Sequence, residues 1–216
     1  MAESQPPRRS PEDKVEALKR AAARAPERRG DDRLPPGQVE TKKWPVLHHG
    51  EVPRTDLAKW DFRVFGLVAA PLRFTWAEFA ALPMTETASD IHCVTRWSRF
   101  GMPWRGVLVR DLMARVTLSP KAAFVLAHGE NGFTANLPLG DFLRDENLLA
   151  THADGAPLTP EHGFPLRLVV PHLYFWKSAK WLRGLEFLEK DRAGFWESVG
   201  YHRRGDPWTE ERFDSD

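Results

Sequence analysis

Hydrophobic residues fall into short segments separated by turn residues, and this spacing predicts several short strands. Over 60–68, WDFRVFGLV, large apolar residues alternate with polar ones, as they do in a half-buried strand. Asn131-Gly132 and Asp154-Gly155 are typical of the tight turns that join such strands. Further strands are predicted at 122–128, 165–171 and 180–190, the last interrupted by Gly184.

Helix signals are short and scattered among the strands. Thr75-Trp76-Ala77-Glu78 is a capping box that opens a short helix, which Pro83 ends. A second helix is predicted at 107–113, and Ser10 is expected to cap a peripheral N-terminal helix. Short strands mixed irregularly with short helices predict an α+β fold rather than a regular βαβ alternation. We expect an N-terminal extension over 1–33, helical or partly disordered, followed by a single domain over 34–216.

Composition and charge narrow the possible partners. The 31 Lys and Arg residues against 30 Asp and Glu residues give a net charge of +1. We therefore expect neither nucleic acid nor an anionic membrane as a partner. No segment approaches the roughly 18 apolar residues of a membrane span. Arg8-Arg9 lacks the following apolar run of about 7 to 15 residues that an export signal needs, so the expected location is cytoplasmic.

Cys93, the single cysteine among 216 residues, is the first candidate for chemistry. The segment DIHCV reads as a strand end, which places Cys93 just before a loop. It could be a buried structural thiol, a nucleophile paired with a histidine, or a metal ligand. In a strand, the His92 side chain would point to the face opposite to that of its neighbour Cys93. The nearby arginines Arg96, Arg99 and Arg105 would favour a thiolate. The sequence has no ligand spacing that is typical of a zinc site.

The segment HLYFWKSAKWLRG, residues 172–184, is the second candidate. Lys177, Ser178 and Lys180 combine two ammonium groups with a hydroxyl, which suits a phosphate, although a solvated basic turn is the better explanation of this segment taken alone. Arg167 lies in the apolar segment PLRLVVP and must either point away from the core or reach a buried anion.

These segments resemble the molybdopterin-binding domain of the sulfite oxidase family, and most closely its small stand-alone members. The resemblance rests on DIHCVTRWS followed by PWRGV, and on HGFPLRLVVPHLYFWKSAKWL, in that order. LPPGQ, WPVLHHG and GFWESVGYH extend it over roughly 34–213. It implies a mixed α+β fold of the sulfite oxidase type that holds one molybdenum and its pterin.

The resemblance also implies roles for individual residues. Cys93 matches the cysteine that ligates molybdenum in the family, and Arg96 is expected to orient substrate beside it. Arg99 and Arg105 could assist or could be plain surface charge. Other residues match positions that contact the pterin, its phosphate or the pocket: His48, His92, His152 (in a loop near the pterin), Arg167, Lys177, Ser178 and Lys180. The short Lys177–Lys180 segment favours the plain pterin over a dinucleotide.

We therefore expect a two-electron oxygen-atom transfer enzyme acting on a sulfite-like compound or an S- or N-oxide. The sequence contains no CxxCH motif and no further cysteine, so neither haem nor an iron–sulfur cluster is expected. A separate electron-transfer protein is implied. The alternatives are a carrier module that binds molybdopterin without turnover and a Cys/His hydrolase, for which no family signature is present.

Overall fold

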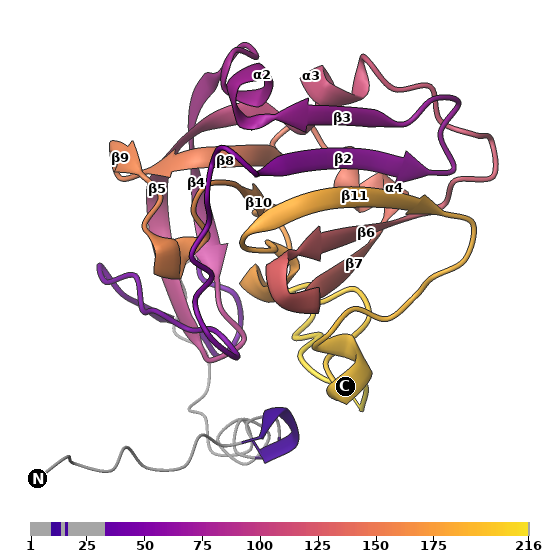
Figure 1. Cartoon of the computed structure of the whole chain (residues 1–216). Coiled ribbons are helices and arrows are strands. Elements are labelled where there is room, and N and C mark those ends of the chain that lie inside the picture. The colour runs from indigo at the N-terminus through magenta and orange to yellow at the C-terminus, as the bar shows by residue number, and fades with distance from the viewer. Residues whose placement is uncertain (1–9, 14–15, 17–32, 216) are drawn as a thin grey trace, which may run out of the picture.

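The computed structural model describes residues 10–13, 16 and 33–215 (Figure 1). Most of the predicted extension over 1–33 lies outside these ranges. Within it, the Ser10 hydroxyl accepts a hydrogen bond from the Asp13 amide at 3.1 Å, and the Asp13 carboxylate accepts one from the Ser10 amide. This reciprocal pair is the helix cap that the sequence predicted.

One sheet has five strands in the order β3-β2-β11-β6-β7. β2 and β11 pair in parallel, whereas the other neighbours are antiparallel. The predicted strands at 60–68, 122–128 and 180–190 are confirmed as β2, β6 and β11. The strands are β2 (Asp61–Gly66), β3 (Leu72–Thr75), β6 (Phe124–Gly129), β7 (Thr134–Pro138) and β11 (Leu182–Leu188).

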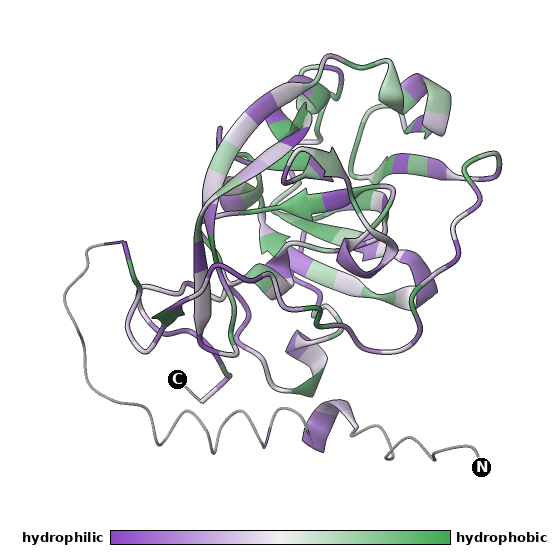
Figure 2. Cartoon of the chain, turned by 90° about the vertical axis from the view of Figure 1, so that its left-hand side faces the viewer, coloured by the Kyte–Doolittle hydropathy of each residue, from purple (hydrophilic) through white to green (hydrophobic). Residues whose placement is uncertain are grey.

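The second sheet has six strands and is built on a long hairpin. Its central path is β1-β5-β8-β10, with β4 paired to β5 and β9 paired to β8. Figure 2 shows hydrophilic and hydrophobic residues alternating along its long strands, as a sheet with one covered face requires. The strands are β1 (Val39–Glu40), β4 (Thr85–His92), β5 (Trp97–Leu108), β8 (Leu148–Ala153), β9 (Ala156–Pro157) and β10 (Arg167–Val169).

The helices are short, and one of them corrects a sequence prediction. The Thr75–Glu78 capping box is confirmed at the start of α2 (Trp76–Ala80). The helix predicted at 107–113 begins later, because β5 continues to Leu108 and α3 is confined to Val109–Met113. The remaining helices are α4 (Leu139–Phe142) and single 3₁₀ turns at Glu130–Gly132, Pro160–His162, Phe175–Lys177 and Glu197–Val199.

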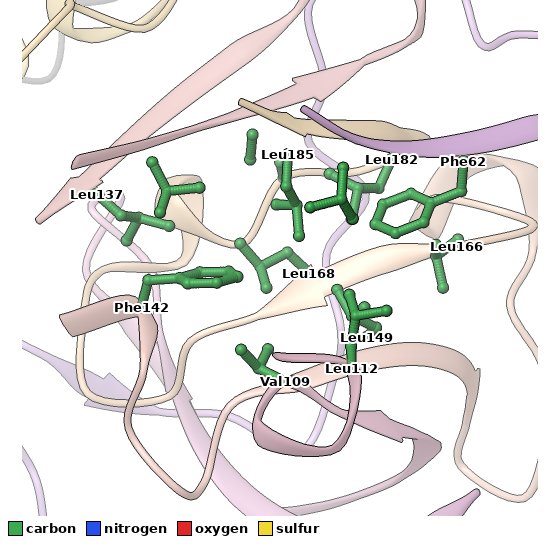
Figure 3. Close-up of a cluster of buried hydrophobic side chains, with 14 of the residues drawn as sticks. Phe62, Val109, Leu112, Leu137, Phe142, Leu149, Leu166, Leu168, Leu182 and Leu185 are labelled. Atoms are coloured by element: carbon green, nitrogen blue, oxygen red, sulfur yellow. The ribbon is translucent and has the colours of Figure 1, made fainter. Parts of the chain in front are cut away.

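A core of aliphatic and aromatic side chains fills the space between the two sheets (Figure 3). Phe62 and Leu185 from the five-stranded sheet, Leu168 from β10 and Phe142 from α4 are fully buried. Each such side chain contributes about 1.5–3 kcal/mol relative to exposure. One contiguous cluster draws on both sheets, which confirms the single α+β domain and fixes the β4–β5 hairpin relative to β10 and the segment after it.

Candidate functional site

Cys93 lies in the turn of the β4–β5 hairpin and faces a cavity of about 370 Å³. The turn is closed by hydrogen bonds from the Cys93 amide to the Trp97 carbonyl and from the Arg96 amide to the Cys93 carbonyl, at 2.8 and 2.9 Å. The predicted position just after a strand is therefore confirmed. The cavity is within the range of small-ligand sites.

Eight of the 18 residues in the cavity wall are aromatic, and they come from widely separated segments. Trp44 and Tyr201 come from opposite ends of the chain, and Trp176 packs edge-on against Tyr201 with ring centroids 4.9 Å apart. Sequence reasoning missed this wall, because only the chain fold brings its members together. The aromatic lining residues are Trp44, Trp97, Phe133, Phe175, Trp176, Trp181, Trp196 and Tyr201.

Burial raises the pKa of the Cys93 thiol, and the Thr95 hydroxyl, 3.1 Å from Sγ, opposes that effect only in part. Weaker opposing contributions come from Arg212 and Lys180. The expectation that the hairpin arginines would favour the thiolate is therefore wrong. Arg99 is held by the Asp154 carboxylate at 2.6 and 2.8 Å.

The remaining two arginines of the hairpin also lie off the cavity wall. Arg96 directs its guanidinium at the Gly37 carbonyl, 3.2 Å away. Arg105 is exposed on β5. Neither residue lines the cavity.

Two cations line the same cavity. The Arg167 side chain is buried, donates to the carbonyls of His162 and Ser178 at 3.0 Å, and stacks on the Phe175 ring at 4.2 Å. In the described part of the chain no carboxylate forms an ion pair with it. Burial lowers the pKa of Arg167 to about 9. A buried guanidinium paired only with carbonyls and rings is suited to an added anion.

Lys180 is the second cation. Its ammonium donates to the carbonyls of Leu47 and Glu161 at 2.8 and 2.6 Å, and burial, reinforced by Arg167, lowers its pKa to about 7. The Ser178 hydroxyl also lines the cavity and accepts a hydrogen bond from the Val170 amide at 2.9 Å. The structure thus brings Arg167, Ser178 and Lys180 together beside the thiol.

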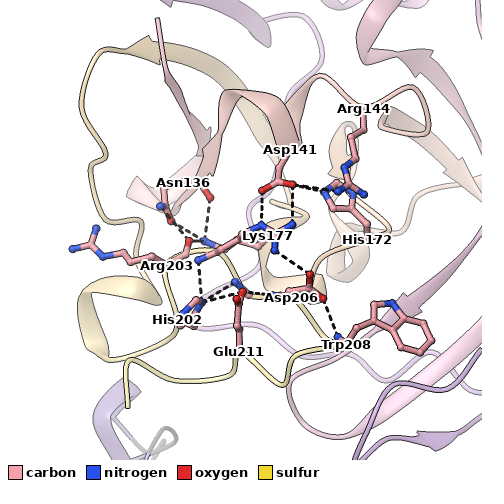
Figure 4. Close-up of polar contacts among 12 residues, drawn as sticks. Asn136, Asp141, Arg144, His172, Lys177, His202, Arg203, Asp206, Trp208 and Glu211 are labelled. Carbon is pink, nitrogen blue, oxygen red and sulfur yellow. Dashed lines mark hydrogen bonds and ion pairs between the residues drawn. The ribbon is translucent and has the colours of Figure 1, made fainter. Parts of the chain in front are cut away.

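Lys177, by contrast, points away from the cavity. Its fully buried ammonium forms an ion pair with Glu197 at 2.6 Å. It also donates to Asn136 and to the Arg203 carbonyl (Figure 4). Lys177 is not among the lining residues. Direct contact of this ammonium with a phosphate in the cavity is therefore not supported by the geometry.

The three candidate histidines occupy different places. His48 lines the cavity and donates from Nδ1 to the Gly50 carbonyl at 3.1 Å. His92 is buried beside the Ser98 hydroxyl, 2.8 Å from Nδ1, and burial lowers its pKa to about 4. His152 was expected in a loop but lies within strand β8, because that segment pairs with β5 and β9. Neither His92 nor His152 lines the cavity.

The donor set fits an anionic cofactor that brings its own metal ligands. In the described ranges no group of three or more His, Cys, Asp or Glu residues is arranged to hold a metal ion, so a metal at Cys93 would need ligands from the cofactor. Arg167 and Lys180 would meet a negative group, and the rings would cover a planar one. Trp97 lines the cavity, and its buried Nε1 has no acceptor among the described residues.

Comparisons with known proteins agree with this arrangement. The profile of the oxidoreductase molybdopterin binding domain matches residues 49–196. YuiH of Bacillus subtilis (strain 168), described as an uncharacterized oxidoreductase, is 52% identical over 182 residues, covering 84% of this chain and 92% of YuiH. The putative protein-methionine-sulfoxide reductase subunit YedZ1 of Azospira oryzae is 28% identical over 170 residues, covering 77% of this chain and 64% of YedZ1.

Among solved structures, the sulfane dehydrogenase SoxCD of Paracoccus pantotrophus matches with a TM-score of 0.60 and 26% identity. The match covers 66% of this chain but 41% of that one, and an NADH nitrate reductase of Hordeum vulgare is matched over 19% of its length. The chain described here belongs to the oxidoreductase molybdopterin-binding domain family and has its sulfite oxidase-type fold.

Proposed function

We propose that this protein is a molybdenum-dependent oxidoreductase in which the Cys93 thiolate is the one protein ligand to the metal. The observation that carries this proposal is the meeting of a lone thiol with the buried Arg167 and the half-buried Lys180 in one cavity that is rich in aromatic side chains. When bound, the cofactor supplies two-electron oxygen-atom transfer, chemistry that no side chain of the protein can perform.

The side chains of the protein would bind and orient the cofactor. Arg167 and Lys180 would hold the phosphate of the pterin, with Ser178 beside them, and the aromatic wall would cover the ring system. Because a metal requires the thiolate, its binding would release the Cys93 proton that burial otherwise retains. His48 lies on the same wall and could contact either cofactor or substrate. Two cations favour the plain pterin form with one phosphate.

The reaction also needs a small substrate and an electron partner. A sulfite-like compound or an S- or N-oxide would exchange one oxygen atom, and the two electrons would pass to or from a separate protein. The sequence offers one cysteine and no CxxCH motif for a second redox centre. None of the helices in the described ranges is long and apolar enough to cross a bilayer. The single thiol supports a reducing, cytoplasmic setting.

The first experiment is elemental analysis of protein from a host that makes molybdopterin, comparing the native chain with Cys93→Ser and Lys180→Met. We expect about one molybdenum per native chain, a changed visible absorption in Cys93→Ser and loss of pterin in Lys180→Met. The exposed lysine variant Lys190→Met is the matched control and should load normally. Absence of molybdenum and pterin from the native protein would refute the proposal.

Turnover separates the enzyme from a carrier module. Reduced viologen with a sulfoxide or an N-oxide, or sulfite with a dye acceptor, should be converted by the loaded native protein and not by Cys93→Ser. A loaded protein inactive in every such assay would favour the carrier. In a Cys/His hydrolase, His92 would not be the base, because its Nδ1 is hydrogen-bonded to the Ser98 hydroxyl and not to the thiol.

A further inference from the structure

The loop that carries Cys93 is held from outside by both ends of the described domain. Gln38 and Arg212 lie beyond the region that the family profile covers, 49–196. Gln38 Nε2 donates to the Cys93 carbonyl at 3.0 Å, and Arg212 Nη1 donates to the Val94 carbonyl at 2.9 Å. We propose that Arg212 is a positioning residue of the Cys93 site, an inference that rests on the proposed role of Cys93 as cofactor ligand.

The loop needs such support because its own backbone is strained. Arg96 has a φ of 75°, a left-handed conformation that non-glycine residues rarely adopt. Strained residues of this kind persist only when the surrounding structure holds them, at a cost of order 1–3 kcal/mol each. The two internal hydrogen bonds of the turn leave the Val94 carbonyl to an outside donor, and that donor is Arg212.

Arg212 is itself firmly placed. Only 3% of the residue is exposed, and its guanidinium packs over the Tyr174 ring at 4.8 Å. Its Nη2 donates to the Pro36 carbonyl at 3.1 Å, while the Glu210 carboxylate lies 3.7 Å away. The buried Arg212 side chain therefore links the Cys93 loop, at Val94, to the N-terminal arm, at Pro36. Its hydrogen bonds are charge-assisted and so are stronger than neutral ones.

The segment that carries Arg212, residues 200–214, closes on itself next to the loop. Tyr201 and Phe213 form a β-bridge, the His202 amide donates to the Arg212 carbonyl at 3.2 Å, and the Asp214 amide donates to the Gly200 carbonyl. Figure 1 shows this segment below β6 and β7, at the end of the domain. Because Tyr201 lines the cavity, the same segment supplies both wall and support.

The N-terminal arm, residues 36–38, also contacts the loop through Gly37. This residue has a φ of 66°, a left-handed conformation that favours glycine, and its carbonyl accepts a hydrogen bond from the Arg96 guanidinium at 3.2 Å. Arm, loop and tail thus form one contact unit, the Cys93 clasp, defined by Gln38, Arg96 and Arg212. Its effect is to keep a buried thiol aimed into the cavity before any cofactor is present.

The single cysteine makes this testable without activity. In the cofactor-free full chain, iodoacetamide can alkylate only Cys93, and mass spectrometry gives the rate. We expect about tenfold faster alkylation in Arg212→Met and near-native rates in Arg212→Lys, whose ammonium can still donate to the Val94 carbonyl. Arg204→Met is the matched control, because Arg204 lies on the same segment but binds Asp141 at 2.9 Å.

An unchanged rate in Arg212→Met, or equal acceleration in Arg204→Met, would overturn the inference. If Arg212→Met does not fold, hydrogen exchange of the Cys93 amide is compared in Arg212→Lys and Arg212→Gln. Native protection in Arg212→Lys together with faster exchange in Arg212→Gln supports the clasp. Equal exchange rates in the two variants refute it. Molybdenum content of the native protein tests the proposed function separately, so either idea can fail alone.

Discussion

The substitution Glu197→Gln measures how much the negative charge of Glu197 contributes to stability in the buried Lys177–Glu197 ion pair. Lys177 and Glu197 are 2.6 Å apart with both side chains fully buried, and Glu197 also accepts from the Trp176 indole at 2.8 Å. An amide can keep those hydrogen bonds but leaves the ammonium without its counter-charge. Breaking a buried pair costs about 3–5 kcal/mol. Because the geometry survives, we expect the lower end, about 3 kcal/mol, or roughly 6–12 °C in Tm.

The pH dependence provides a sharper check. Burial lowers the pKa of Lys177, and the Glu197 charge opposes that effect. Without the charge the folded-state pKa falls further below the unfolded value, so the unfolded chain binds more protons in that window and stability rises with pH. The deficit of Glu197→Gln relative to the native protein should therefore shrink between about pH 7 and pH 10.

Urea unfolding followed by tryptophan fluorescence measures both quantities. Glu186→Gln is the matched control, because Glu186 is partly exposed, unlike Glu197, and pairs with the exposed Arg192 and with His128; this variant should cost less than about 1 kcal/mol. A Glu197→Gln deficit below about 1 kcal/mol, or one that is constant from pH 7 to pH 10, would refute the assignment of Lys177 to the core. Molybdenum loading at low temperature should survive Glu197→Gln, in contrast to Lys180→Met.

Three further predictions test the fold. Gly106→Ala should destabilise by about 1–3 kcal/mol, since a Cβ there would overlap the main chain of β8, whereas Gly140→Ala has open space and should be neutral in the same thermal melt. Three arginines hold the pKa of the Asp61 carboxyl well below its usual range, so the ionised carboxylate stabilises the native protein at pH 7 and loses this effect below about pH 4. Asp61→Asn should lack this contribution, so the stabilities of the native protein and the variant should converge when both are titrated to low pH. Thr75→Ala should cost about 1 kcal/mol through loss of the hydroxyl that caps the Glu78 amide, measured against Thr75→Ser as a near-native variant.

Local signals predicted most of the five-stranded sheet and missed the long strand of the other. Residues 97–108 do carry a period of two, with Met102 and Trp104 buried between exposed neighbours. Gly101 and Pro103 interrupt that pattern with residues that disfavour strands. The hairpin partner β4 and the strand β8 nevertheless hold the segment extended, and such long-range pairing cannot be inferred from the segment alone.

The site shows the same limit at the level of single side chains. The motif that contains Lys177 and Lys180 could not reveal which ammonium faces the cavity. A 3₁₀ turn at Phe175–Lys177 and a left-handed Trp181, with a φ of 52°, send the two lysines in different directions. Cys93 could be singled out because it is unique, whereas Arg212 acts across 118 residues of chain, a contact that no local pattern encodes.

Although the net charge of the chain is close to zero, two positive side chains lie together at the cavity. Arg167 is buried and Lys180 half-buried beside the aromatic wall, and desolvation lowers the pKa of each, which means that the fold disfavours both cations as they stand. A site that stabilised only the empty protein would place a carboxylate next to them, as it does for Lys177. Under the proposed function a bound anion would take this role, and its binding energy would come partly from relief of a desolvation cost already incurred in folding. The strained Cys93 loop adds to that cost at the same cavity, which is what we expect of a protein that gives up stability to hold a cofactor site ready.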